Sequence, residues 1–228
     1  MLADELCAET LHLEGGEIDL LRPCEAAELP DVGGVEWAPP VPYWSVLWRS
    51  GVALGDDVST RKLKGLRVVE LGCGLAVPSL AASRAGAAVL AIDESEEALE
   101  LLFRNATRNG LPLETLCVDW AHPAELLARP RFDLALAADV LYQRESSARL
   151  LELLPRLAPR VLLAEPGRPA ADHFLAEVRR SWSVTTRITG VVRIHTLERP
   201  TDPERFQGSR PEGASPDETG TDGCRATN

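Results

Sequence analysis

Two apolar segments joined through a glycine turn constrain the fold of this chain more than any other feature. The first, residues 68–71, leads into Gly72 and Gly74, and the second, residues 89–92, ends at Asp93. This order of strand, glycine turn, helix, strand and acid is typical of a doubly wound nucleotide site. The glycines let the backbone approach a ligand, and the next helix directs free N–H groups at it. Asp93 can accept hydrogen bonds from ribose hydroxyls, although a turn with no ligand is the simpler alternative.

Apolar segments with strand and helix patterns alternate along the central part of the chain. Strands are predicted near 66–71, 88–92, 113–118, 132–138 and 160–165. Helices are predicted near 77–86, 95–109, 122–128, 145–157 and 169–181. Such alternation predicts an α/β fold with a mainly parallel sheet that is covered on both faces. Two further strands, near 183–189 and 191–197, are joined at Gly190 and must therefore be antiparallel.

The first 60 residues are predicted to pack on this core rather than to form part of it. Residues 11–14 and 17–21 alternate around a Gly-Gly turn, which predicts a small N-terminal β-hairpin. Residues 22–42 are rich in proline and glycine and are expected to form a loop. From Tyr43 to about Leu54, the spacing of Trp44, Leu47 and Trp48 predicts an entry helix.

The composition changes after Arg199. Residues 200–228 consist mostly of Pro, Gly, Ser, Thr and acidic residues, with one aromatic side chain. Such a segment buries too little apolar surface to offset its ordering entropy, so we expect a disordered tail. The sequence thus divides into an appendage over 1–60, a ligand-binding domain over 61–199 and a tail over 200–228.

Composition limits the classes of partner and the compartment. The 228 residues, 45% of them hydrophobic, suit one domain with a full core, and no apolar run reaches membrane-spanning length. The net charge of −11 disfavours nucleic acid and mildly favours a basic substrate, although a solvated acidic surface is the commoner cause. The five scattered cysteines make a poor disulfide framework and show no metal-ligand spacing, so we expect a reducing cytoplasm and no metal.

The residues around the glycine turn decide between nucleotide classes. A dinucleotide site needs glycine or alanine three residues after Gly74, and this chain has Val77 there. Glu70-x-Gly72-x-Gly74 resembles the first motif of class I S-adenosylmethionine-dependent methyltransferases, with Ala76 in place of its last glycine. The resemblance covers about residues 8–198. It implies S-adenosylmethionine as cofactor and a seven-stranded, Rossmann-like sheet that ends in an antiparallel hairpin.

Three further residues are candidates for binding this cofactor. Asp119 and Trp120 follow the third core strand, where the resemblance places the adenine. A helix cap and a buried tryptophan are the structural alternative. Trp44 lies in Pro42-Tyr43-Trp44-x-x-x-Trp48, a segment that looks like one lying over the cofactor in methyltransferase family 16. Aromatic faces suit a sulfonium cation, but packing of an entry helix explains Trp44 equally well and Trp48 better.

The candidate catalytic residues are Asp139 and Tyr142, which follow the fourth core strand. Their Asp-x-x-Tyr pattern also resembles family 16, which includes protein-lysine methyltransferases and enzymes that modify the electron-transfer flavoprotein beta subunit. Asp139 is expected to orient the ammonium of a lysine acceptor, and Tyr142 to line its channel. After the fifth strand, Glu165 or Arg168 is expected near the substrate mouth, unless these residues form a plain turn.

The preferred interpretation is therefore a protein-lysine N-methyltransferase, whose partner is a protein with an accessible lysine, possibly similar to electron-transfer flavoprotein. Three alternatives stay open at this point. The first is a small-molecule N-methyltransferase that acts on a small amine. The second is an NAD-binding oxidoreductase, which Val77 and the lack of a Tyr-x-x-x-Lys pair disfavour. The third is a binding module that keeps the cofactor fold without activity.

Overall fold

A computed structural model describes residues 5–24, 42–142 and 144–200 of the chain. The predicted tail over 200–228 lies outside the described residues except for its first position, as does most of the predicted loop over 22–42. Among the described residues, no helix is long and apolar enough to cross a membrane.

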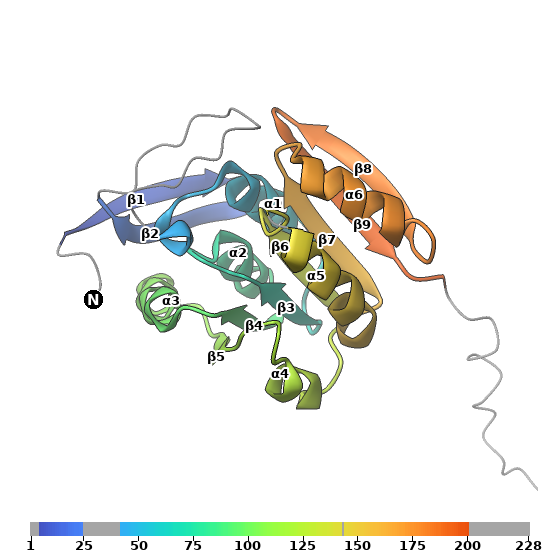
Figure 1. The fold of residues 1–228 in the computed structure, drawn as a ribbon. Helices are drawn as coiled ribbons and strands as arrows, with labels where there is room; N and C mark the ends of the chain where they lie inside the picture. Colours follow the sequence, from blue (N-terminus) through green and yellow to red (C-terminus); the bar gives the residue numbers. More distant parts are fainter. Residues whose placement is uncertain (1–4, 25–41, 143, 201–228) are drawn as a thin grey trace, which may run out of the picture.

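The core is a seven-stranded sheet with the order β5-β4-β3-β6-β7-β9-β8 (Figure 1). Its strands are β3 (Arg67–Leu71), β4 (Ala88–Asp93), β5 (Glu114–Cys117), β6 (Leu134–Ala138), β7 (Arg160–Glu165), β8 (Ser183–Thr189) and β9 (Val192–Glu198). The first five are parallel to one another, whereas β9 runs antiparallel to both β7 and β8. The predicted fold class is confirmed, and the strand order reverses between β3 and β6, where ligands bind in such sheets.

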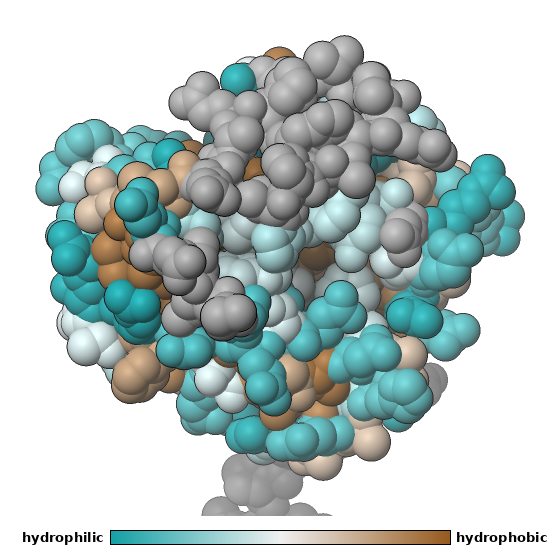
Figure 2. All heavy atoms as spheres, turned by 60° about the vertical axis from the view of Figure 1, so that its left-hand side comes forward, coloured by the Kyte–Doolittle hydropathy of each residue, from teal (hydrophilic) through white to brown (hydrophobic). Residues whose placement is uncertain are grey.

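Helices cover both faces of the sheet, as the nearly continuous burial of its central strands requires. Buried residues of α1 (Arg49–Ser59), α2 (Val77–Arg84) and α3 (Glu96–Asn109) form one apolar cluster with the N-terminal hairpin. Those of α4 (Ala124–Ala128), α5 (Arg144–Leu157) and α6 (Pro169–Val178) form the cluster on the other face. The outer surface in Figure 2 is mostly hydrophilic with small apolar patches, in keeping with the acidic composition.

The predicted N-terminal hairpin is present and consists of β1 (Leu6–Leu13) and β2 (Gly16–Pro23). Two asparagines of α3 replace a neighbouring strand along the outer edge of β2. Asn105 accepts a hydrogen bond from Leu21 N and donates one to Leu21 O, and Asn109 does the same with Asp19. Because the asparagines are four residues apart on the helix, they match the two-residue repeat of the strand edge.

Replacing Asn105 by alanine is expected to lower the free energy of unfolding by about 2 kcal/mol, because it leaves the N–H and C=O of Leu21 without these partners. Asn105 is fully buried, so water does not easily take its place. Urea unfolding measures the loss, and the exposed Arg104→Ala on the same helix is the control. Equal stabilities of the two variants would show that the asparagine contacts do not hold the hairpin.

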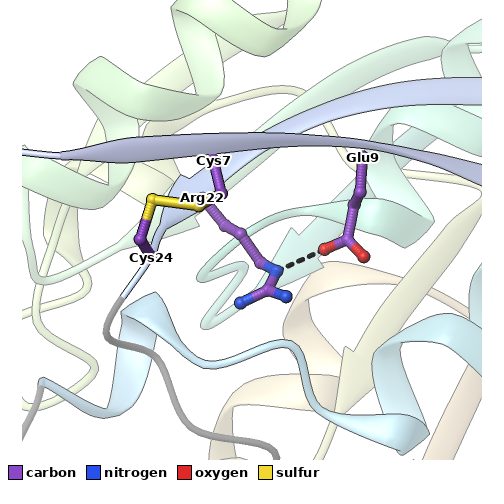
Figure 3. The surroundings of a disulfide bond; sticks show 4 residues. All are labelled: Cys7, Glu9, Arg22 and Cys24. Atoms are coloured by element: carbon purple, nitrogen blue, oxygen red, sulfur yellow. Dashed lines mark hydrogen bonds and ion pairs between the residues drawn. A yellow bond between two sulfur atoms is a disulfide. The ribbon is translucent and has the colours of Figure 1, made fainter.

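The cysteines correct one prediction. Cys7 and Cys24 form a disulfide with a Cα–Cα distance of 5.0 Å, beside the ion pair between Glu9 and Arg22 (Figure 3). The register of the hairpin explains the pairing. Cys7 lies opposite Arg22, and Cys24 comes two residues after Arg22, so the two cysteines are diagonal neighbours across the strands. Spacing along the chain could not reveal this neighbour relation. Cys73 and Cys117 are free, and no cluster of metal-binding side chains occurs within the described ranges.

The entry helix also differs from its prediction. Residues Tyr43–Ser45 form a single 3-10 turn, Trp48 is extended, and α1 begins only at Arg49. Hydrogen bonds hold this bend: the Ser45 hydroxyl donates to Pro42 O, and the Trp48 indole N–H donates to Tyr43 O. The tryptophans therefore do not share one helix face, and the bend turns this segment towards the carboxyl ends of the core strands.

Candidate active site

A cavity of about 440 Å³ opens at the carboxyl ends of β3, β4 and β6. This volume lies in the range of about 300–1,000 Å³ that small-molecule sites occupy. Its lining includes every residue that the sequence proposed for cofactor or catalysis: Trp44, Glu70, Gly72, Gly74, Asp93, Asp119, Trp120, Asp139 and Tyr142. The structure therefore brings together side chains from five separate stretches of the chain.

The glycine loop between β3 and α2 has no room for side chains. Gly72 and Gly74 have φ of +62° and +49°, which disfavour other residues. A Cβ at Gly72 would lie 3.2 Å from Cζ2 of Trp120, and one at Gly74 would lie 3.0 Å from the carbonyl oxygen of Trp44. Ala76 also has a positive φ, of 56°, which explains why a third glycine suits this position. The loop is thus a bare backbone cradle at the start of α2.

Asp93 ties the second strand to this loop. One carboxylate oxygen accepts from Gly74 N at 2.9 Å, and the other accepts from Ser95 N at 3.0 Å. Burial raises the pKa of the carboxyl group, and these backbone N–H groups oppose the shift. Since a carboxylate offers about four acceptor positions, Asp93 keeps capacity for the hydroxyls of a ribose.

Glu70 lies at the base of the cavity and is only 1% exposed. A carboxyl oxygen of Glu70 accepts from Ser79 N at 2.8 Å, so it satisfies one of the free N–H groups in the first turn of α2. Burial raises its pKa to about 8. The native state therefore holds a proton on Glu70 between about pH 4.5 and pH 8, where the unfolded chain has lost it.

This proton predicts a pH dependence of stability. Unfolding between pH 4.5 and pH 8 releases the Glu70 proton, so the contribution of this residue to stability falls as pH rises through that window. Replacing Glu70 by glutamine keeps the shape and should reduce the loss of unfolding free energy between pH 6 and pH 8 by about 2 kcal/mol. Urea unfolding at pH 6 and at pH 8 measures this change in unfolding free energy, and replacing the exposed Glu100 by glutamine is the control. The same loss of unfolding free energy between pH 6 and pH 8 in both variants and in the parent chain would contradict a raised pKa of Glu70.

Aromatic rings form the mouth of the cavity. Tyr43 stacks on Trp48, with ring centroids 6.2 Å apart, and on Tyr142, at 5.9 Å. Trp48 therefore belongs to the mouth, where packing alone was the favoured explanation from the sequence. Tyr43 is not one of the candidate residues from the sequence, and the density of aromatic residues over 43–48 is the sequence signal that points to it. Burial raises the pKa of Tyr142, which keeps its hydroxyl protonated as a donor.

Asp119 and Trp120 occupy the far wall of the cavity. Asp119 accepts from Ala121 N at 2.8 Å and lies beside His122 and Arg149. The Ala121 N–H lowers the pKa of Asp119, helped by His122 and Arg149. Asp119 thus closes the turn that follows β5 and also lines the cavity, but it does not cap a helix, because α4 begins after Pro123 without a side-chain cap. Trp120 lies over Gly72 of the glycine loop and also lines the cavity.

Asp139 and Glu165 end neighbouring strands but differ in role. Asp139 has φ of 56°, an unusual conformation for a residue other than glycine, and its carboxylate is paired with the guanidinium of Arg168 at 2.7 Å. Glu165 is fully buried and contacts His195 at 3.1 Å and Arg193 at 2.6 Å. Burial opposes ionisation of Glu165, but these contacts and two backbone N–H groups lower its pKa. Glu165 therefore holds the turn. Neither it nor Arg168 lines the cavity itself, but Arg168 contacts Asp139 and Trp48, which do.

Comparison with known proteins agrees with this geometry. Residues 32–180 match the family described as lysine methyltransferase. The chain belongs to this family. It is an S-adenosylmethionine-dependent methyltransferase, and the glycine cradle, Asp93 and the aromatic mouth fit that cofactor.

Individual relatives carry different substrate names. The chain is 34% identical over 152 residues to protein N-lysine methyltransferase METTL21A of Danio rerio. This match covers 61% of this chain and 69% of that protein. It is 35% identical over 111 residues to human histone-arginine methyltransferase METTL23, a match that covers 46% of this chain and 58% of that protein. The electron transfer flavoprotein beta subunit lysine methyltransferase of Mus musculus is 29% identical over 141 residues, a match that covers 58% of this chain and 54% of that protein. The chain thus spans little more than half the length of the last two proteins.

Solved structures share the fold. A 16S rRNA methyltransferase of T. Thermophilus has a TM-score of 0.65 at 17% identity, over 86% of this chain and 51% of that one. Magnesium protoporphyrin IX methyltransferase of Synechocystis with bound S-adenosylmethionine has a TM-score of 0.53 at 20% identity, over 72% and 87%. The former acts on RNA, so fold alone does not decide the substrate.

Proposed function

We propose that this enzyme transfers a methyl group to the side-chain amine of lysine in a protein substrate. One observation carries the proposal: the candidate acceptor residues and the cofactor cradle share one cavity. A Cβ at Gly72 would lie 3.3 Å from the side chain of Val140, which directly follows Asp139. The end of β6 is therefore beside the loop that closes β3, and an acceptor held there is next to the cofactor.

When bound, S-adenosylmethionine supplies a methyl group on a sulfonium for in-line displacement. Alignment and exclusion of water matter more for such a step than a strong acid or base. The stacked rings of Tyr43, Trp48 and Tyr142 supply an apolar channel at the mouth. The acceptor nitrogen must be neutral, although free lysine has a pKa of about 10.4, and we assign no dedicated base for the proton. Asp139 orients the incoming ammonium, and Tyr142 positions the nitrogen lone pair.

The family match and the fish and mouse relatives support lysine as the acceptor. A protein similar to electron-transfer flavoprotein is one candidate substrate, and the negative charge of the chain favours a basic surface on the partner. Arginine is a second candidate, because the human histone-arginine methyltransferase is 35% identical over the matched residues. Small amines and nucleic acid are the competing acceptor classes.

Labelling separates these acceptor classes. We expect the enzyme, incubated with cell extract and S-adenosylmethionine labelled in its methyl group, to label a protein band that protease removes and nuclease leaves. A variant with valine at Gly72 is the matched negative control, since it lacks the cofactor cradle. Label that is confined to nucleic acid or to small metabolites would contradict a protein substrate.

We also propose a cytoplasmic location. Because that compartment keeps cysteines reduced, the Cys7–Cys24 disulfide of the structure is expected to be open in the cell, with both residues as thiols. They lie close enough to form the disulfide of the structure after oxidation. Alkylation in freshly quenched cells, followed by mass spectrometry, is expected to modify both residues. A pair that resists alkylation until reductant is added would contradict the proposed location.

A further inference from the structure

Arg168 lies where an acceptor cation is expected to bind. Its Nε donates to Asp139 Oδ1 at 2.7 Å, and its guanidinium carbon lies 5.8 Å from the centre of the Trp48 ring. Asp139 and Trp48 both line the cavity, so Arg168 touches its edge at two points. The Asp139 side chain is 5% exposed and that of Arg168 is 30% exposed. The carboxylate that would attract an ammonium is thus already paired with a cation of the same chain.

The backbone of Arg168 is fixed, whereas its side chain extends towards the cavity from the surface. Glu165 accepts hydrogen bonds from the backbone N–H groups of Gly167 and Arg168, at 2.6 Å and 2.9 Å. Pro169 then begins α6 in the first helical position, where proline is favoured. The long, partly exposed side chain can leave Asp139 without disturbing the turn, and the face of Trp48 remains available to it.

An arginine in this place acts as a competitor for other cations. Its guanidinium is always charged, and the ion pair has one strong hydrogen bond in a poorly solvated place. A second cation that approaches Asp139 meets the like charge of Arg168 and has to displace it. A neutral acceptor does not compete for Asp139, so the pair weakens the binding of cations and leaves the binding of neutral acceptors unchanged.

We propose that Arg168 sets the affinity of the acceptor site for cations: it pairs with Asp139 as an internal competitor that the ammonium of the acceptor lysine must displace. This inference rests on the proposed function, because it takes the acceptor to be a lysine side chain. Binding of a cation to the enzyme tests it without any transfer of methyl. The probe is n-butylammonium, which has the chain length and charge of a lysine side chain.

The experiment titrates n-butylammonium into the full chain loaded with S-adenosylhomocysteine and measures the dissociation constant by NMR. Arg168→Gln and Arg168→Met are expected to bind the probe at least tenfold more tightly than the parent chain. Arg168→Lys, which keeps the charge, should stay within about threefold. Arg180→Gln, which removes an exposed arginine paired with Glu177, is the matched control and should bind as the parent does.

Two further measurements make the result specific. Adding Asp139→Asn to Arg168→Gln should remove the gain in affinity, and uncharged n-butanol should bind the parent and the Arg168 variants equally. Unchanged or weaker n-butylammonium binding in both Arg168→Gln and Arg168→Met would overturn the proposal, even if lysine is methylated. Failure of the proposed function looks different, because methyl-lysine would then be missing from the products whatever the binding constants are.

Discussion

Replacing Gly72 by valine is expected to reduce the affinity for S-adenosylhomocysteine by at least about 100-fold, or about 2.7 kcal/mol, while the chain still folds. Valine is disfavoured at the φ of +62°, by about 1–2 kcal/mol for any L residue and more for a branched one. Its Cβ would also lie 3.2 Å from Trp120 and 3.3 Å from Val140. The loop must move, and the cradle for the cofactor is lost.

Gly110→Val is a close control for this experiment. Gly110 has φ of +63°, nearly the same as Gly72, but nothing lies within 4 Å of its added Cβ. The control therefore introduces the same backbone strain at the end of α3, outside the cavity lining. Calorimetry measures binding, and circular dichroism checks the fold. Binding of Gly72→Val within threefold of the parent, or equal losses in both variants, would show that the loop is not the cofactor site.

Replacing Asp139 by asparagine, or Tyr142 by phenylalanine, is expected to leave cofactor affinity within a few fold and to slow methyl transfer by roughly 10–100-fold. That loss corresponds to about 1.4–2.7 kcal/mol of transition-state stabilisation, which suits one charge-assisted hydrogen bond. The asparagine keeps the shape of Asp139 but loses the charge to which we assign attraction of an ammonium. Phenylalanine keeps the ring that stacks on Tyr43 but loses the hydroxyl to which we assign positioning of the acceptor.

Single-turnover transfer and calorimetric binding on the same preparations decide the roles of these two residues. Asp172→Asn is the control, because Asp172 also forms an ion pair with an arginine, Arg193, but lies outside the cavity lining. If Asp139 serves only the fold, through its pair with Arg168, its variant loses stability and keeps its specific transfer rate. Transfer at the parental rate in both variants would make Asp139 and Tyr142 structural residues.

Local patterns were enough to predict the core of the fold. The apolar segments of β3, β4, β6 and β7 are bounded by turns, and each lies within two residues of its predicted ends. The helices follow signals that act within one turn. In α3, for example, the Ser95 side chain accepts from Ala98 N, and Gly110 ends the helix in the left-handed conformation. Candidate residues at strand ends were brought together because parallel strands end at one edge.

Contacts between distant segments could not be predicted in this way. Arg168 and Asp139 are 29 residues apart, and only the pairing of β6 with β7 makes them neighbours. The asparagines of α3 bind a strand more than 80 residues earlier, and nothing in a helical pattern marks them for it. The helix expected from Tyr43 was wrong in its start because hydrogen bonds around Pro42 and Trp48 overrode the helical spacing.

The residue that carries the label after methyl transfer tests the account most directly. The enzyme is incubated with methyl-labelled S-adenosylmethionine and with the unlabelled form of the protein that the extract experiment identifies as substrate. The purified product is then digested and sequenced by mass spectrometry. Labelled methyl groups on a lysine Nζ, absent from the reaction with Gly72→Val, are the predicted result. Label on arginine, on a glutamine amide or only on a small molecule would contradict a lysine methyltransferase that acts at this cavity.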